Sequence, residues 1–99
     1  MPRNKCKRHI SNLPGVTYYK PAGIPLGQMS EVLVTYDELE AIKLADLENN
    51  YQKEAAIKMN ISRQTFGRII ESAHSKIADA LLNGKAIKIE GGNIEIKNS

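Results

Sequence analysis

A short amphipathic stretch and a long one, separated by only a few residues, constrain this sequence more than any other feature. The short stretch runs from about Gln52 to Met59 and carries small residues on one side. The long stretch starts at Ser62 and runs to about Asn83, and its apolar residues recur every three or four positions. Asn60 breaks the pattern between them, and Ser62 suits an N-cap. The pattern predicts two helices joined by a tight turn, as in a DNA-reading helix-turn-helix.

Another helix is predicted ahead of these two. Thr35 and Glu38 have the spacing of a capping box, in which each side chain bonds the backbone amide of the other residue. An apolar face follows to about residue 48, where Asn49–Asn50 ends the helix because asparagine tolerates a left-handed conformation. Gly84 fits the end of the long helix in the same way. The sequence therefore predicts three helices between residues 35 and 84.

Residues 1–34 are predicted to form a basic, extended arm that packs on the core. Three of the four prolines and three of the seven glycines fall between Leu13 and Gly27, so a helix is not expected there. The same stretch is too apolar for a free linker. Val32–Val34 is predicted to be a short strand.

Residues 85–99 are predicted to form a β-hairpin. Ala86–Glu90 and Asn93–Lys97 alternate in polarity, and Gly91–Gly92 between them suits a two-residue turn. In that register Ile89 faces Ile94.

The chain of 99 residues leaves room for one core. The fold class expected is mainly α, with a trihelical helix-turn-helix domain over residues 35–84. The extended arm, residues 1–34, and the hairpin, residues 85–99, complete the same domain. No apolar run approaches the ~18 residues that a membrane span needs. A single cysteine forms no internal disulfide, so we expect a cytoplasmic protein with no membrane role.

The net charge of +3 conceals a strong segregation. Residues 1–30 carry five basic residues and no acid, residues 31–61 carry three basic and seven acidic residues, and residues 62–99 carry six and four. This distribution predicts that nucleic acid follows residues 1–20 and the start of the long helix, away from the acidic first helix.

Polar side chains at the start of the long helix are the candidate DNA contacts, because arginine forks onto guanine, glutamine onto adenine, and threonine reaches the thymine methyl. Gly67 lies among them and costs ~1 kcal/mol of helix propensity compared with alanine. Because it has no side chain, it allows close approach to a groove wall or to another helix. The predicted base contacts are Arg63, Gln64, Thr65 and Arg68. The predicted phosphate contacts are Ser62, Arg3, Lys5, Lys7 and Arg8. The alternative interpretation is an ordinary trihelical core whose arginines and glutamine are merely solvated.

Two resemblances support the helix-turn-helix. Region four of bacterial sigma factors is similar to the stretch Glu54-Ala-Ala-Ile-Lys-Met-Asn-Ile-Ser-Arg-Gln-Thr-Phe-Gly-Arg-Ile70. A prokaryotic family of unknown function, predicted to bind DNA, resembles about residues 1–92, through Leu13-Pro-Gly-Val-Thr-Tyr-Tyr-Lys-Pro-Ala-Gly-Ile-Pro25, Ser62-Arg-Gln-Thr-Phe-Gly-Arg68 and Gly84-Lys-Ala-Ile-Lys-Ile-Glu-Gly-Gly92. The resemblances imply a winged-helix-like fold and sigma-type contacts at Arg63, Gln64, Thr65 and Arg68. Thr65 and Gly67 stand where sigma factors often have arginine, so sigma-type promoter specificity is not implied.

Other chemistry-bearing residues favour no second function. Cys6 and His9 have metal-ligand spacing, but two ligands do not make a zinc site. Asp37, Glu38 and Glu40 are explained by capping and an exposed helix face rather than by acid–base catalysis. We therefore expect no metal, no cofactor and no enzymatic activity.

The sequence thus predicts a transcriptional regulator that reads the major groove of double-stranded DNA with the helix starting at Ser62. One such motif contacts few base pairs, so we expect a homodimer, formed through the hairpin or the long helix. The alternative is a non-catalytic interaction module that docks on RNA polymerase or another regulator, with Tyr18, Tyr19 and Pro21 as a contact patch.

Overall fold

Three α-helices and five β-strands form in a computed structural model that describes residues 7–96. A 3-10 turn, η1, precedes β3, and a π-helical turn, η2, extends α1. In chain order the elements are β1 (Arg8–Ile10), β2 (Tyr18–Tyr19), η1 (Leu26–Gln28), β3 (Glu31–Val34), α1 (Tyr36–Ile42), η2 (Lys43–Leu47), α2 (Gln52–Lys58), α3 (Arg63–Asn83), β4 (Ala86–Ile89) and β5 (Ile94–Ile96).

The helix ends predicted from capping are confirmed. At the start of α1 the Thr35 amide donates to the Glu38 carboxylate over 2.9 Å, which is one half of the capping box. At the start of α3 the Ser62 hydroxyl accepts from the Thr65 amide over 3.1 Å. Three left-handed residues mark helix ends: Asn49 (φ 59°), Asn60 (φ 60°) and Gly84 (φ 66°).

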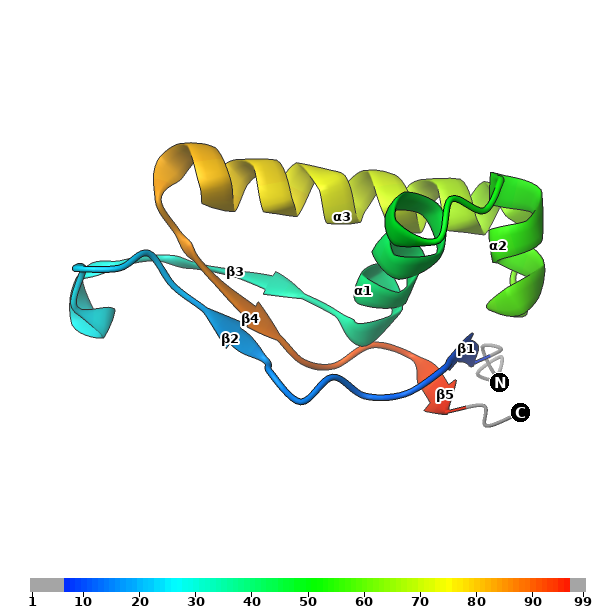
Figure 1. The fold of residues 1–99 in the computed structure, drawn as a ribbon, viewed down its shortest axis with the longest axis horizontal. Coiled ribbons are helices and arrows are strands. Elements are labelled where there is room, and N and C mark those ends of the chain that lie inside the picture. The colour runs from blue at the N-terminus through cyan, green and yellow to red at the C-terminus, as the bar shows by residue number, and fades with distance from the viewer. Residues whose placement is uncertain (1–6, 97–99) are drawn as a thin grey trace, which may run out of the picture.

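The hydrophobic core lies where the three helices meet. Ala55 and Ala56 are buried and let α2 come close to its neighbours, while Met59 and Phe66 are fully buried. Figure 1 shows α1 and α2 gathered at the N-terminal end of α3, with the rest of α3 running over the three-stranded sheet. The core cluster comprises Ala41, Leu44, Ala55, Ala56, Met59, Phe66, Ile69 and Ile70.

The strands form two small sheets. In the larger, β4 is central, antiparallel to β2 and parallel to β3. Val32 and Val34 of β3 are buried. In the smaller sheet β1 and β5 pair in parallel, with Arg8 opposite Ile94. Both sheets join segments that are distant in sequence.

The structure contradicts the prediction of a mainly α fold, because five strands in two sheets accompany the helices. The predicted hairpin is also wrong, since β4 and β5 do not pair with each other. Two other strands occupy both edges of β4, and Gly91–Gly92 carries the chain past the start of α1 instead of turning it back. The Tyr36 amide donates to the Gly91 carbonyl over 2.9 Å, and a Cβ on Gly92 would lie 2.8 Å from an Asp37 oxygen.

The residues predicted as an extended arm supply β1, β2 and β3, and the predicted strand at Val32–Val34 is confirmed. β1 runs beside the turn between α2 and α3: the His9 amide donates to the Met59 carbonyl over 2.9 Å, and Ile10 is buried. Among the described residues no helix has the length and apolarity that a membrane crossing requires.

Candidate nucleic-acid interface

A short turn at residues 59–62 joins α2 to α3, as the predicted helix-turn-helix requires. The turn is closed by the Ile61 amide, which donates to the Ala56 carbonyl over 3.0 Å. Of the predicted base contacts, Arg63, Gln64 and Arg68 are exposed and Thr65 is half-buried. Polar side chains are therefore exposed at the N-terminal end of α3.

A hollow of about 330 Å³ lies beside the start of α3, and we call it the Arg8 hollow. It brings together β1, the start of α1 and the first three turns of α3, and so joins predicted phosphate and base contacts on one face. Its lining residues are Arg8, Thr35, Asp37, Glu38, Thr65, Arg68, Ile69 and Ser72.

Ser62 and Thr65 are linked at the rim of this hollow. The Ser62 hydroxyl accepts from the Thr65 amide and donates to the Thr65 hydroxyl over 2.9 Å. Thr65 is half-buried and lines the hollow together with Arg8. Of the predicted base contacts, Thr65 and Arg68 thus line the same hollow as the predicted phosphate contact Arg8.

Arg8 is held by Asp37 of α1. Its Nε lies 3.7 Å from a carboxylate oxygen of Asp37, and this nitrogen is buried without a hydrogen bond to any described residue. The Asp37 side chain is also anchored, because it accepts from the hydroxyl of Thr35 and from the Glu38 amide. Part of the positive charge of Arg8 is therefore neutralised inside the protein.

Glu38 joins α1 to α3 at the floor of the hollow. Its carboxylate accepts from the Ser72 hydroxyl over 2.6 Å and from the Lys76 ammonium over 2.9 Å, in addition to the Thr35 amide. Burial by itself would raise the pKa of Glu38, but the hydrogen bonds from Lys76, Ser72 and Thr35, with the Lys76 charge, outweigh it and hold the pKa below its usual value. The charged Glu38 carboxylate therefore links α1 to α3 through an ion pair and a hydrogen bond.

The expectation that Asp37, Glu38 and Glu40 line an exposed helix face is wrong, because all three are buried. Glu40 accepts from the Ser11 hydroxyl and lies 3.9 Å from the Lys43 ammonium. The first helix is also not remote from the predicted interface, since its start lines the Arg8 hollow. The distribution of charge along the sequence does not reveal that these carboxylates contact cations and hydroxyl groups from other elements.

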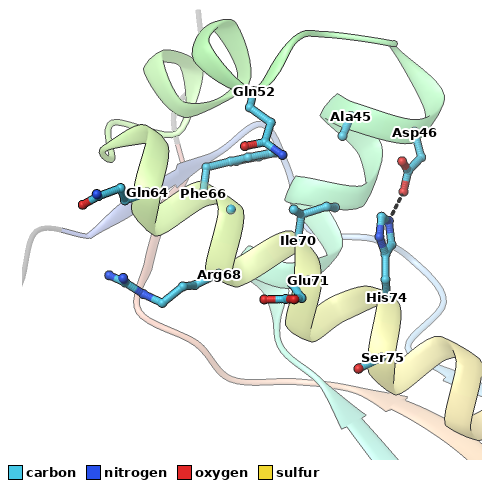
Figure 2. A pocket seen from close by; sticks show the side chains of 11 residues that line it. Ala45, Asp46, Gln52, Gln64, Phe66, Arg68, Ile70, Glu71, His74 and Ser75 are labelled. Atoms are coloured by element: carbon cyan, nitrogen blue, oxygen red, sulfur yellow. Dashed lines mark hydrogen bonds and ion pairs between the residues drawn. The ribbon is translucent and has the colours of Figure 1, made fainter.

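A broader groove of about 970 Å³ runs along α3 and is bounded by η2 and the start of α2; we call it the α2–α3 groove. Figure 2 shows Gln52 reaching from α2 toward α3, and Asp46 and His74 paired at one end of the groove. The His74 and Asp46 side chains lie 2.6 Å apart. Arg68 lines both this groove and the Arg8 hollow. The full lining is Ala45, Asp46, Gln52, Gln64, Phe66, Gly67, Arg68, Ile70, Glu71, His74 and Ser75.

Sequence reasoning missed Gln52 and Glu71 as parts of this surface. Gln52 begins α2 one turn before the buried alanines, so its place on the edge facing α3 could have been found from helical spacing. Glu71 follows Gln64 by seven residues and shares its face of α3.

Gly67 lines this groove, although neither its backbone conformation nor its packing within the chain requires glycine. Its backbone is not left-handed, and a Cβ added to it would meet only the side-chain oxygen of Gln52, at 3.6 Å, an ordinary contact. The neighbouring helix therefore does not require glycine here, although glycine costs the helix about 1 kcal/mol relative to alanine.

Lys20 lies elsewhere, although it contributes to the basic first third of the sequence. With Tyr19, Pro21 and Leu81 it lines a groove at the C-terminal end of α3. Here Lys85 donates to Asp79 and, with Asn83, holds the pKa of that carboxyl below its usual value.

The Tyr18 hydroxyl donates to Glu31 instead of lining this groove, and the bond raises the pKa of its phenol. The predicted Tyr18–Tyr19–Pro21 patch is therefore divided.

Arg3, Lys5 and Cys6 lie outside the described residues, and Lys7 is exposed. Within residues 7–96 no group of three His, Cys, Asp or Glu side chains is arranged to hold a metal ion.

Comparison with known proteins gives consistent matches along the chain. The family described as "Protein of unknown function DUF134" matches residues 1–97. A UPF0251 protein of Caldanaerobacter subterraneus subsp. tengcongensis is 56% identical over 97% of this chain and 81% of its own length. A UPF0251 protein of Dehalococcoides mccartyi strain BAV1 is 57% identical over 97% of this chain and 82% of its own length. No solved structure matches the chain.

Proposed function

We propose that this chain, which belongs to the DUF134 family of proteins of unknown function, binds double-stranded DNA through the start of α3 and acts as a non-catalytic transcriptional regulator in the cytoplasm. The observation that carries the proposal is the Arg8 hollow. There β1 sets Arg8 beside Thr65 and Arg68, so a predicted phosphate contact lies next to two predicted base contacts at the start of α3.

In this proposal three of the four predicted base contacts keep that role. Thr65, which the sequence predicts as a base contact, is reassigned to the phosphates because it lines the Arg8 hollow with Arg8. The exposed side chains of Arg63, Gln64 and Arg68 enter the major groove, where arginine pairs with guanine and glutamine with adenine. Ser62 and Thr65, with Arg8, face the phosphates at the rim, and Arg3, Lys5 and Lys7 continue along the backbone.

The carboxylates around the Arg8 hollow are compatible with a bound polyanion, because each is already engaged. Asp37 faces Arg8, and Glu38 faces Lys76. The same engagement supports a non-catalytic role, since neither carboxylate is free to move a proton to or from a ligand.

We further propose that two copies of the chain bind one DNA site, because a single motif contacts few base pairs. Leu81 and Leu82, exposed at 75% and 84% on the last turn of α3, provide an apolar surface for the second copy at the end opposite the DNA contacts. Sedimentation of the wild type and of the L81E/L82E double variant tests this: we expect a dimer that the variant converts to a monomer. A wild-type monomer on DNA would contradict it.

Selection of bound duplexes from a random-sequence pool tests DNA reading against the interaction-module alternative. We expect an enriched motif for the wild type, and loss of enrichment for R63A and R68A. The matched control is K20A, which removes one positive charge at the other end of α3 and should retain the motif. Weak, salt-sensitive binding without any enriched motif would instead favour a protein-interaction module.

A further inference from the structure

Gly67 stands at the centre of the surface that would face DNA. It lies one turn after Gln64 and one turn before Glu71 on α3, and all three line the α2–α3 groove. Gln52 of α2 closes the other side, with its side-chain oxygen 3.6 Å from the position that a Gly67 Cβ would take. The helix surface is therefore flat at one point and flanked by the amides of two glutamines.

Neither conformation nor packing inside the chain accounts for this glycine. Gly67 has ordinary helical backbone, and an added methyl group would make one normal contact. Alanine is a better helix former at such a position. The space above Gly67 therefore points to a group from outside the chain that approaches the helix closely.

We propose that Gly67 seats an A·T base pair, with the thymine methyl lying on its Cα. This inference rests on the proposed DNA binding and specifies its base preference. The thymine methyl is the apolar group that a base pair presents in the major groove, and glutamine is the side chain that forks onto adenine N6 and N7. A bare helix surface between Gln52 and Gln64 matches both halves of that pair.

The charges around the groove agree with this assignment. Arg68 lines both the α2–α3 groove and the Arg8 hollow. Its guanidinium can therefore bind a guanine next to the A·T base pair. Asp46 at the far end is paired with His74, and Glu71 offers an acceptor to an exocyclic amine of cytosine. Apart from the residues next to it in the chain, the described structure places no charged side chain within 4 Å of the position that a Gly67 Cβ would take.

The test combines G67A with removal of the thymine methyl. A motif is first selected with the full-length wild type, and duplexes are then made with thymine or with deoxyuridine at each A·T position. We expect one position at which deoxyuridine weakens wild-type binding about fourfold, the loss of one buried methyl. G67A should bind the thymine duplex about tenfold more weakly than the wild type, because two methyl groups then compete for one space. At that position G67A should bind the deoxyuridine duplex more tightly than the thymine duplex.

Two controls complete the experiment. S75A changes one atom in the same groove two helical turns away and should bind both duplexes as the wild type does. G67A should melt at least about 4 °C above the wild type, because alanine favours the helix. A lower melting temperature, or a changed oligomeric mass, would show that the glycine serves the protein itself and would overturn the inference.

The remaining outcomes are equally decisive. Equal affinity of G67A and wild type for the thymine duplex overturns the inference, and so does an equal loss on both duplexes. In either case the wild-type motif would still stand as support for DNA reading. Failure of the wild type to enrich any motif would instead remove the proposed function.

Discussion

Arg8 of β1 and Arg68 of α3 line the same hollow although sixty residues separate them in the sequence. The pairing of β1 with β5 and the bond from the His9 amide to the Met59 carbonyl bring them together. Two basic segments that are remote in the chain thus share one face, as a protein that binds both the groove and the backbone of DNA requires.

Replacing Arg68 with alanine should weaken binding to the selected duplex by about 1 to 3 kcal/mol and relax the preference at one base pair. The reason is that its exposed guanidinium lies on the wall shared by both surfaces. Fluorescence anisotropy with the selected duplex and with single-base variants of it measures both effects. K20A is the control of equal charge, and an R68A variant as tight and as selective as K20A would contradict the assignment.

The N-terminal segment should act on all sequences alike. Replacing Arg3, Lys5 and Lys7 together by alanine removes three predicted phosphate contacts. The slope of log K against log salt, which is negative, should become shallower by roughly 0.9 for each phosphate that is no longer neutralised. Substitution is preferable to truncation through residue 8, because Arg8 and His9 are hydrogen-bonded into the fold. The control triple variant, K20A/K85A/K88A, carries the same charge change at the sheet, and an equal slope for both would refute a role of the arm.

Removing the charge of Asp37 should strengthen DNA binding. In D37N the positive charge of Arg8 is no longer neutralised, so the salt slope should become steeper by up to about 0.9, the value of one extra phosphate contact. D79N makes the same charge change beside Lys85 at the other end of α3. If D37N and D79N bind DNA with the same salt dependence, Arg8 does not face a phosphate.

Glu38 should make the stability of the fold sensitive to acid. Its pKa in the folded protein is lower than the ordinary 4.5, so its stabilisation is fully present above that pH and is lost as the pH falls toward the folded value. E38Q should lower the free energy of unfolding by about 2 kcal/mol at pH 7, because charged hydrogen bonds to Ser72 and Lys76 are lost.

Urea titrations between pH 3 and pH 7 measure this difference. The gap between wild type and E38Q should narrow below pH 4.5, while E54Q, at an exposed position on α2, should stay within about 0.5 kcal/mol of the wild type at each pH. A gap that is constant with pH would mean that Glu38 contributes through packing rather than charge.

The turn of the motif depends on a left-handed asparagine. N60A should lower the free energy of unfolding by about 1 kcal/mol, because alanine at φ 60° is strained, whereas N60G should remain close to the wild type. N12A, at an asparagine that is not left-handed, is the control. Thermal melts of the three variants check the order, and equal losses for N60A and N60G would point to an interaction of the asparagine side chain instead.

Local signals predicted the helices well and the sheets poorly. Thr35, Ser62, Asn60 and Gly84 act within one helical turn, so their roles are visible in sequence, and the helix ends fall where they indicate. The partners of β4 and β5 depend on contacts far apart in the chain. Nothing near Gly91–Gly92 distinguishes a hairpin turn from a close passage beside Asp37.

The same distinction applies to the candidate site. Exposure of Arg63, Gln64 and Arg68 followed from helical spacing, and the structure agrees. The neutralisation of Arg8 by Asp37 and the tie from Glu38 to Lys76 could not be predicted, because each joins elements whose relative placement only the tertiary structure provides.

DNA binding at the start of α3 is tested most sharply by titrating isotope-labelled protein with the selected duplex and following its amide NMR shifts. The chain has a mass of 11.0 kDa, which suits this method. We expect the largest shifts at Arg8 and across Ser62–Arg68, and small ones at Tyr18 and Tyr19. The largest shifts at Tyr18 and Tyr19, with none at the start of α3, would contradict the proposed interface.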